Sequence, residues 1–475
     1  MGAYLEKKAA PIAIAVAGLR RLGVKCLGTM LLYNCRTILA DSLVDCAILA
    51  DGESGKISGI SRVADENRPV DERLDCRGLV ALPGMVDVHV HFRDPGQIHK
   101  EDFYSGTAGA LAGGTTAILD MPNNSPPICN EQSLKEKIAV ARGKAVCDWG
   151  LYFGATPANQ EEAARIARGH SEVKGLKVYL GSSTGDLLVE DAGAVERHLQ
   201  SFPKGKIVAM HAEDEREIRG STAELKQKDP EGSVEYHNII RSPKAASLAV
   251  QAACDLGSKA HRHVHICHAS TKGEIDVVRT YSNGAEKVSV EVCPHHLFLT
   301  ENDALRLGNY GKVNPPLRSR VDVAALWDEL SMENSVVDCI ATDHAPHTRE
   351  EKEKGYWDAP SGIPGVQTRV PLMLDAVNRN LISLSQMVKY CATNPAKLFG
   401  LEGKGSLREG MDADIILVDL KKEWTIRAEG QLSKCGHTPY DGRKVTGSVE
   451  KTFLRGKLAW DGENVCAKAG DGKPL

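Results

Sequence analysis

The chain has 475 residues, of which 42% are hydrophobic and 26% charged, and its formal net charge is −4. This composition is typical of a globular protein, and the near balance of 59 basic and 63 acidic residues offers no basic face for nucleic acid. A chain of this length predicts two or three domains, or one large barrel with an appendage.

Residues 1–29 precede the first strand-like run, which opens at Met30, and we predict that they form an N-terminal extension. Their apolar stretch, residues 9–19, is too short to cross a bilayer, but its basic flanks leave a targeting peptide as an alternative. The 13 cysteines contain no CxxC pair, which disfavours a disulfide framework and a structural zinc finger. We therefore expect a cytoplasmic protein.

Short β-like segments with frequent turn residues flank the centre of the chain, at residues 30–83 and 400–462. The second segment contains residues 413–419, an apolar core bounded by acidic residues that is typical of a short buried strand. We predict that the two segments pair into one small β-sandwich domain, and that residues 463–475 form a C-terminal tail.

Between residues 84 and 399, short apolar runs alternate with longer amphipathic, alanine-rich segments, a pattern typical of repeated βα units. The predicted strands are residues 85–91, 115–121, 147–154, 174–180, 206–211, 262–267, 287–292 and 337–342. Such a series predicts an α/β fold, a (β/α)8 TIM barrel beside the terminal β-sandwich domain. The active site of such a barrel lies at the carboxyl ends of its strands.

The first predicted strand carries the most informative pattern of the chain. Side chains two apart in a strand share a face, so Asp87, His89, His91 and Arg93 line one side. Two imidazoles on one face can bind one metal ion. The alternative is a pair of hydrogen-bonded core histidines, but a buried row of such polar groups is costly without partners.

The other predicted strands also end in polar, metal-competent side chains. These are Asn123, Lys177, His211, Cys267, His268, His295, His296, Asp343 and His344. Four histidines and Asp343 exceed what one tetrahedral zinc with an open position needs, so the pattern implies two metal ions with a bridging ligand.

Lys177 is the candidate for that bridge. Burial beside two dications disfavours the charged form of a lysine, and a neutral amine can capture CO2 as a carbamate whose two oxygens bind two metals. The alternative is an exposed strand-end lysine, or one whose amine reaches back to water.

These residues stand in motifs that resemble the dihydroorotase family of the amidohydrolase superfamily, type I in particular, over residues 30–462. The motifs are His89-Val90-His91-Phe92-Arg93, Met121-Pro122-Asn123, Gly175-Leu176-Lys177-Val178-Tyr179-Leu180, Val264-His265-Ile266-Cys267-His268, Glu291-Val292-Cys293-Pro294-His295-His296 and Asp343-His344-Ala345-Pro346-His347. The first and the last, the latter followed by Lys352, are the most specific.

The resemblance implies two Zn²⁺ ions bridged by N6-carboxylated Lys177. One zinc is expected on His89, His91, Lys177 and Asp343, and the other on Lys177, His211 and His268. Some relatives bridge with an aspartate, whereas this chain has the lysine. Cys267 and Glu291 match relatives in which they hold an accessory metal, but a buried cysteine is more often a packing residue.

The reaction implied is the reversible cyclisation of N-carbamoyl-L-aspartate to L-dihydroorotate in pyrimidine biosynthesis, with Asp343 as the catalytic proton carrier. Substrate contacts are expected from Arg93, Asn123 and His347 to the carboxylate, and from the backbones of Asn314 and Gly362 to the ring amide. Ser183 and Thr184 stand where relatives carry a lid loop with two threonines, or a threonine and a phenylalanine.

Two alternatives remain open. One is another cyclic amidase, an allantoinase or dihydropyrimidinase, from which Arg93 and His347 distinguish this chain. The other is a non-catalytic scaffold, although all six expected metal ligands are present. For partners we expect a small-molecule substrate, no nucleic acid and no membrane, with a homo-oligomer or an association with aspartate transcarbamoylase as further options.

Overall fold

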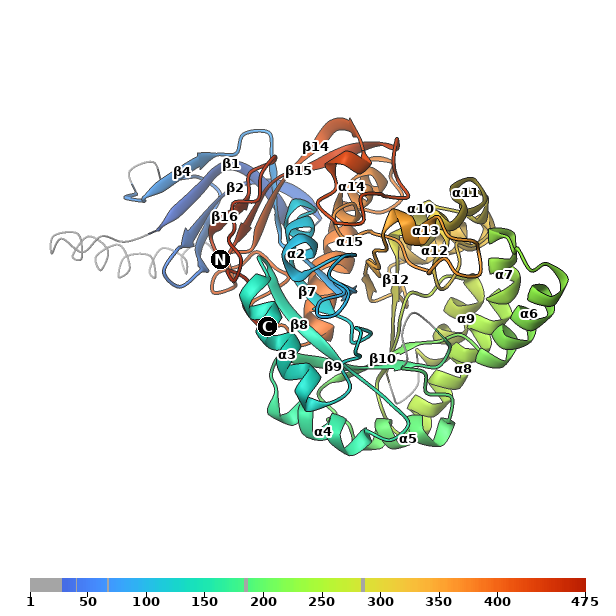
Figure 1. Cartoon of the computed structure of the whole chain (residues 1–475). Helices are drawn as coiled ribbons and strands as arrows, with labels where there is room; N and C mark the ends of the chain where they lie inside the picture. The colour runs from blue at the N-terminus through green and yellow to red at the C-terminus, as the bar shows by residue number, and fades with distance from the viewer. Residues whose placement is uncertain (1–27, 40, 66–67, 183–186, 283–286) are drawn as a thin grey trace.

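The computed structural model describes residues 28–475 except 40, 66–67, 183–186 and 283–286. Residues 1–27 of the predicted extension, and the predicted lid residues Ser183 and Thr184, therefore lie outside the described residues. The description below concerns the remaining chain, shown in Figure 1.

Eight parallel strands pair in chain order and form the predicted barrel. They are β6 (Met85–Val90), β7 (Thr115–Asp120), β8 (Asp148–Gly154), β9 (Val173–Tyr179), β10 (Ile207–His211), β11 (Val264–Ile266), β12 (Val288–Val292) and β13 (Cys339–Ile340). The ring closes beyond β13, where the His91 N–H donates to the His344 carbonyl at 2.8 Å and Val90 bridges to His344. The predicted fold class is confirmed.

Helices cover the outside of the barrel (Figure 1). Some begin at a capping residue, as at the alanine-rich α8, where Ser242 accepts from the Ala245 N–H and Pro243 takes the first helical position. The α-helices are α2 (Phe103–Ala112), α3 (Glu131–Lys144), α4 (Gln160–Gly169), α5 (Ala192–Ser201), α6 (Glu215–Lys228), α7 (His237–Ile240), α8 (Pro243–Lys259), α9 (Lys272–Tyr281), α10 (Pro294–Phe298), α11 (Glu301–Leu307), α12 (Arg320–Ser331), α13 (Arg349–Lys352), α14 (Arg369–Asn378), α15 (Leu384–Val388) and α16 (Asn394–Leu398). Short irregular turns are η2 (Val234–Tyr236), η3 (Gly308–Gly311), η4 (Lys389–Thr393) and η5 (Ala428–Gly430).

The two ends of the chain pair into a second sheet beside the barrel, as the sequence predicts. Its strands are β1 (Met30–Leu39), β2 (Ser42–Asp51), β3 (Lys56–Ser61), β4 (Glu72–Asp75), β5 (Val80–Pro83), β14 (Ile415–Thr425), β15 (Lys444–Leu454) and β16 (Lys457–Trp460). The order is β16-β15-β14-β5-β1-β2-β3, with β4 paired to β1. Figure 1 shows the blue and red strands together, and the junction is the antiparallel pair of β5 and β14.

The C-terminal tail runs along the amino end of the barrel. The Leu475 N–H donates to the Trp149 carbonyl at 2.9 Å, at the start of β8. Among the described helices, none combines the length and the apolar composition that a bilayer crossing requires.

Candidate active site

The candidate site lies where the barrel strands end and the backbone turns sharply. Arg93, His268 and Asp343 have φ angles of 63°, 38° and 47°. Side chains other than glycine rarely adopt this left-handed region, and such backbone strain concentrates at functional sites. The turns explain why β11 and β13 stop before the ends that the sequence predicts for these strands.

His89, His91 and Asp343 form one buried group. Nε2 of His89 lies 3.2 Å, and Nε2 of His91 2.9 Å, from the same Asp343 carboxylate oxygen, Oδ1. The other ring nitrogens have partners of their own: Nδ1 of His91 donates to Oδ1 of Asn123 at 2.5 Å, and Nδ1 of His89 contacts Glu291. Both Nε2 atoms therefore converge on one carboxylate oxygen.

Burial and neighbouring charges shift the pKa values in this group. Burial lowers the pKa of His91 to about 3, so its ring is neutral. Burial also opposes the charged form of His89, but the carboxylate of Glu291 raises the pKa of His89 to about 10. Burial alone would raise the pKa of Asp343, yet His89 and His91 hold it well below its usual value.

His211 and His268 form a second pair. Nδ1 of His211 lies 3.0 Å from Nε2 of His268, and Nε2 of His211 lies 3.0 Å from the carboxylate of Glu213, which also pairs with Arg241. Burial holds the pKa of His268 well below its usual value, with His211 adding to the shift. Nδ1 of His268 is buried and has no hydrogen-bond partner among the described residues.

Lys177 points into the barrel and is fully buried. Its amine donates to the Cys267 sulfur at 2.9 Å and lies 5.1 Å from the centre of the Tyr179 ring. No carboxylate of the described residues lies within ion-pair distance of the amine. The predicted bridging lysine is thus inside the barrel and not at its surface.

These donor sets fit divalent metal ions. A neutral His91 that donates from Nδ1 presents the lone pair of Nε2 to an anionic oxygen 2.9 Å away. Two lone pairs that face each other repel unless a cation lies between them, and a metal-binding histidine characteristically donates its other N–H to an oxygen. The ligand atoms of His89, His91 and Asp343 all lie within 4.8 Å of one another. The structure therefore contains a candidate metal-binding cluster.

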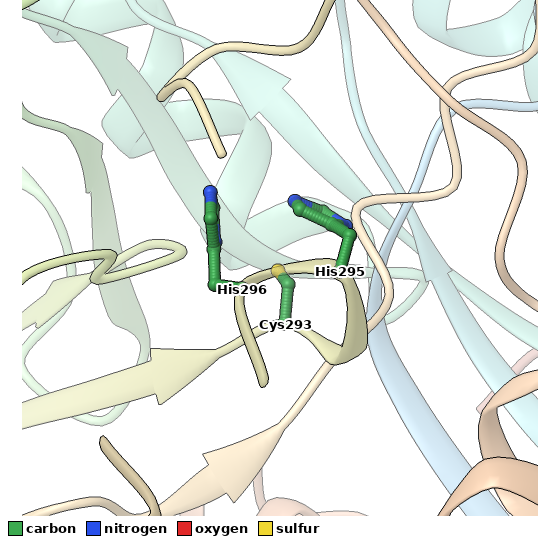
Figure 2. Close-up of side chains that lie close together, drawn as sticks. All are labelled: Cys293, His295 and His296. Carbon is green, nitrogen blue, oxygen red and sulfur yellow. The ribbon is translucent and has the colours of Figure 1, made fainter. Parts of the chain in front are cut away.

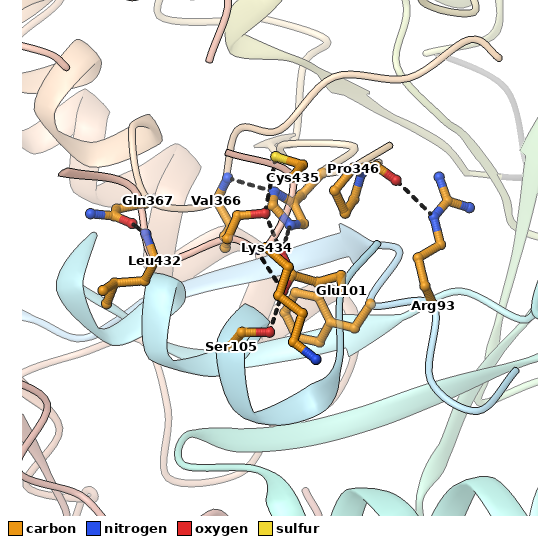
Figure 3. A network of polar contacts seen from close by, with 12 residues as sticks. Arg93, Glu101, Ser105, Pro346, Val366, Gln367, Leu432, Lys434 and Cys435 are labelled. Carbon is orange, nitrogen blue, oxygen red and sulfur yellow. Dashed lines mark hydrogen bonds and ion pairs between the residues drawn. The ribbon is translucent and has the colours of Figure 1, made fainter. Parts of the chain in front are cut away.

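A polar pocket opens beside this cluster. Its lining is His91, Arg93, Asn123, Val313, Asn314, Asp343, Ala345, Ser361 and Gly362. The Arg93 guanidinium donates from Nε to the Pro346 carbonyl at 3.4 Å (Figure 3), while its Nη1 is buried with no hydrogen-bond partner among the described residues. An unpaired guanidinium nitrogen at a pocket wall fits an incoming carboxylate.

His347 does not line the pocket but lies behind it, with its Nε2 3.3 Å from Nη2 of Arg93. Gly362 makes this close packing possible, because a Cβ there would lie 2.5 Å from the Ala345 carbonyl and 3.0 Å from the His347 ring. Of the predicted substrate residues, the structure thus brings Arg93, Asn123, Asn314 and Gly362 to one pocket and leaves His347 buried behind it.

Several supporting residues had no signal in the sequence. Glu101 is buried and binds Ser105, and Figure 3 labels both residues. It also binds Ser433 and the ring of His344, whose Nε2 lies 3.3 Å from the Glu101 carboxylate. Glu101 follows no strand directly, and Ser433 lies more than 300 residues away in the β14–β15 connection. Only their contacts identify them.

The polar side chains that follow β12, the seventh barrel strand, lie in a separate cluster. His295 and His296 gather with Cys293, not with Asp343, and the ligand atoms of these three lie within 4.8 Å of one another (Figure 2). Nε2 of His296 donates to the Pro315 carbonyl at 3.1 Å. The predicted polar residues His295 and His296 therefore form a group with Cys293 that is separate from the cluster of His89, His91 and Asp343.

A parallel barrel with buried imidazole and carboxylate groups at its carboxyl mouth has the architecture of a barrel enzyme. Comparison with known proteins is consistent with this class. The model of the amidohydrolase family matches residues 80–459. The chain therefore belongs to the amidohydrolase family.

The relatives place the chain, within this family, among the dihydroorotases. The chain is 38% identical to a dihydroorotase of Halobacterium salinarum over 89% of this chain and 97% of that protein. It is 37% identical to a dihydroorotase of Pyrococcus furiosus over 88% and 90%. It also matches the multifunctional protein CAD of Squalus acanthias at 36% identity, over 87% of this chain and 16% of that protein.

Among solved structures, the chain resembles the L-hydantoinase (dihydropyrimidinase) of Arthrobacter aurescens, with a TM-score of 0.89 and 29% identity. The alignment covers 94% of this chain and 99% of that one. A dihydropyrimidinase of Brevibacillus agri aligns with a TM-score of 0.86 and 26% identity, over 94% and 98%. The fold is thus shared with a hydantoinase and a dihydropyrimidinase.

Proposed function

We propose that this chain catalyses the reversible cyclisation of N-carbamoyl-L-aspartate to L-dihydroorotate, with release of water, in pyrimidine biosynthesis. One observation carries the choice of substrate: the buried Arg93, with an unpaired Nη1, lines the same pocket as His91 and Asp343. A substrate that brings a carboxylate compensates this buried charge.

The metal ligands of the proposal are the two buried groups joined by Lys177. One zinc would be held by His89, His91, Lys177 and Asp343, and the other by Lys177, His211 and His268. Bound zinc would polarise the ring carbonyl and lower the pKa of water. Carboxylation would turn the Lys177 amine, which lies against Cys267, into the anion that the two ligand sets share.

Asp343 is the proton carrier of this proposal. Its Oδ1 faces His89 and His91, and because its pKa lies well below the usual value the carboxylate is ionised. In hydrolysis the carboxylate takes a proton from the attacking water and passes it to the ring nitrogen. In cyclisation it removes a proton from the carbamoyl nitrogen as that nitrogen attacks the side-chain carboxyl group, whose C–O bond then breaks so that one oxygen leaves as water with that proton and one from solution.

The remaining substrate contacts follow from the pocket. Arg93, Asn123 and His347 bind the α-carboxylate, and the backbones of Asn314 and Gly362 bind the ring amide. Cys267 and Glu291 approach His89 closely enough to hold an accessory metal ion, which stays a secondary option.

A second candidate is hydrolysis of a different cyclic amide, which the hydantoinase-like fold favours. Allantoin and dihydrouracil carry no carboxylate, so they would leave the buried positive charge of Arg93 without a counter-charge. We therefore expect cyclisation of carbamoyl aspartate to exceed hydrolysis of either compound. Assays of all three with the purified, zinc-loaded protein test the proposal, and activity on the latter two alone would overturn it.

The proposal extends to the setting of the enzyme. We divide the chain into a barrel domain, residues 84–399, and a terminal β-sandwich domain, residues 30–83 and 400–462. The described cysteines are unpaired, which supports a cytoplasmic location. A homo-oligomer, or docking to aspartate transcarbamoylase, is proposed by analogy with the multifunctional relative.

A further inference from the structure

Lys352, which follows the motif at the end of the eighth barrel strand, has no role in the proposed function. It ends α13, and its side chain is fully buried. No carboxylate of the described residues pairs with its amine, which donates instead to three backbone carbonyls. These are the carbonyls of Lys312 at 3.1 Å, Pro360 at 2.9 Å and Gly362 at 3.0 Å. Three acceptors match the three hydrogens of an ammonium group.

The three contacts compensate a buried positive charge. Burial lowers the pKa of Lys352 to about 7, and the charge of Lys312 adds to this, whereas Cys435 and Glu351 oppose it. Below pH 7 the amine is protonated, and each of its hydrogens has a carbonyl partner. Burying a charged group is costly unless such partners are present. The amine and the three carbonyls therefore hold one another in place.

The three carbonyls belong to two segments, residues 312–314 and residues 360–362, which we call the wall segments. Residues 313, 314, 361 and 362 line the candidate pocket, whereas Lys352 does not. The Gly362 N–H also donates to the Lys312 carbonyl at 2.9 Å, which joins the two wall segments directly. Lys352 thus fastens the wall segments to each other from behind the pocket.

Backbone groups at a pocket wall cannot adapt to a ligand by changing rotamer, so their positions depend on what holds the chain segment. We propose that Lys352 is a positioning residue that fixes the spacing of the two wall segments and thereby selects the ring size of the substrate. This inference rests on the proposed function, in which the backbones of Asn314 and Gly362, one from each wall segment, bind the ring amide. Small errors in such positions are expected to weaken binding.

Carbamoyl aspartate can close either of two rings. Attack of its carbamoyl nitrogen on the side-chain carboxyl group, with loss of water, gives the six-membered ring of dihydroorotate. The same attack on the α-carboxyl group gives a five-membered hydantoin with a carboxymethyl group. Both products carry one carboxylate, so the pair compares ring size at constant charge.

Lys312 offers a matched control. Its amine is also buried and donates to two backbone carbonyls, those of Tyr356 at 2.6 Å and Ala359 at 2.7 Å. Neither carbonyl belongs to a wall segment or lines the pocket. Lys312→Met therefore removes a comparable amine and releases no carbonyl of the wall segments.

The first test needs no substrate. Amide hydrogen exchange of the full-length, zinc-loaded protein reports how firmly the wall segments are held. We expect Lys352→Met to speed exchange at residue 362 about tenfold, measured below pH 7 by mass spectrometry, and Lys312→Met to leave it within about twofold. Lys352→Gln, which keeps one donor, should give an intermediate rate and replaces Lys352→Met if that variant does not fold.

The second test is calorimetric binding of the two rings to the same proteins. The wild type should bind dihydroorotate at least about tenfold more tightly than carboxymethylhydantoin, the scale for one ring atom in a fitted pocket. Lys352→Met should lower this ratio about tenfold, and Lys312→Met should keep it. In steady-state kinetics, Lys352→Met should raise KM for carbamoyl aspartate about tenfold and change kcat less than about twofold, because the wall binds substrate and transition state alike.

The inference is wrong if Lys352→Met leaves exchange at residue 362 at the wild-type rate, or leaves the ratio of the two dissociation constants unchanged. Wild-type protein that binds both rings equally would also overturn it. Tight binding of dihydroorotate without any cyclisation of carbamoyl aspartate would contradict only the proposed function.

Discussion

Two buried lysines lie at opposite ends of the same barrel, and their surroundings differ. Lys404, at the amino end, is surrounded by three aspartates, at 2.5 Å from Asp148, 2.9 Å from Asp412 and 2.8 Å from Asp414. Lys177, near the carboxyl end of β9, contacts a cysteine sulfur and a tyrosine ring, and no carboxylate of the described residues pairs with it. One lysine is compensated, and the other is not.

The difference distinguishes a lysine that stabilises the fold from a lysine at the candidate active site. Burying a charge is tolerable when partners compensate it, and the aspartates raise the pKa of Lys404 although its burial opposes this. The cluster joins β8 to the start of β14, and thereby the barrel to the terminal sheet. At the mouth, by contrast, Lys177 has no carboxylate partner among the described residues, and Nε2 of the neutral His91 faces Oδ1 of Asp343, an arrangement that a metal ion would stabilise.

Replacing Lys177 should have the largest effect on activity and zinc binding at the carboxyl end of the barrel. Lys177→Ala should abolish measurable cyclisation, a loss greater than the roughly hundredfold cost of removing an outer-sphere partner of a metal. Bound zinc should fall from two ions to at most one, measured by elemental analysis. In the wild type, ¹³CO2 labelling should give a carbamate signal that Lys177→Ala lacks. A variant with two zincs and normal activity would contradict the bridging role.

Exchanging an aspartate at each end sharpens the comparison. Asp343→Asn should lower kcat by about 10² to 10⁴, the range for loss of a general acid–base group. Asp414→Asn is the matched control at Lys404 and should leave kcat near the wild-type value. Steady-state kinetics of both variants measure this difference. An equal fall in kcat would contradict the view that only the carboxyl end of the barrel takes part in catalysis.

Substitution in the cluster of Lys404 with its three aspartates should change the stability of the protein and not its catalysis. Lys404→Met leaves two buried aspartates and the partly buried Asp412 around an apolar side chain, and we expect it to lower the free energy of unfolding by about 3–5 kcal/mol. Urea denaturation measures the change, while KM and zinc content of the folded fraction should match the wild type. A decrease in the free energy of unfolding below about 1 kcal/mol would mean that water or other groups compensate the charges of the aspartates.

The smallest expected effect is confined to substrate binding. Arg93→Met removes the buried guanidinium and keeps the apolar stem, so KM for carbamoyl aspartate should rise about tenfold to a hundredfold. Zinc content should not change, because Arg93 binds no metal in the proposal. If both KM and kcat stayed at wild-type values, the carboxylate would bind elsewhere in the pocket.

Much of the fold follows from local patterns. The alternation of apolar runs and amphipathic segments predicted all eight barrel strands, because both signals repeat within a few residues. The bounds were less accurate at β11 and β13, where the left-handed backbone of His268 and Asp343 ends the strand early. A single torsion angle of this kind leaves no periodic signal.

The sequence by itself determined which side chains stand at the strand ends, since the two-residue period puts His89 and His91 on one face. The tertiary structure alone decided what each of them meets. His89 contacts Glu291 across 202 residues, and His91 approaches Asp343 across 252. Hydrogen-bond partners so distant in the chain depend on barrel closure, and they fix the charges and tautomers on which the chemistry depends.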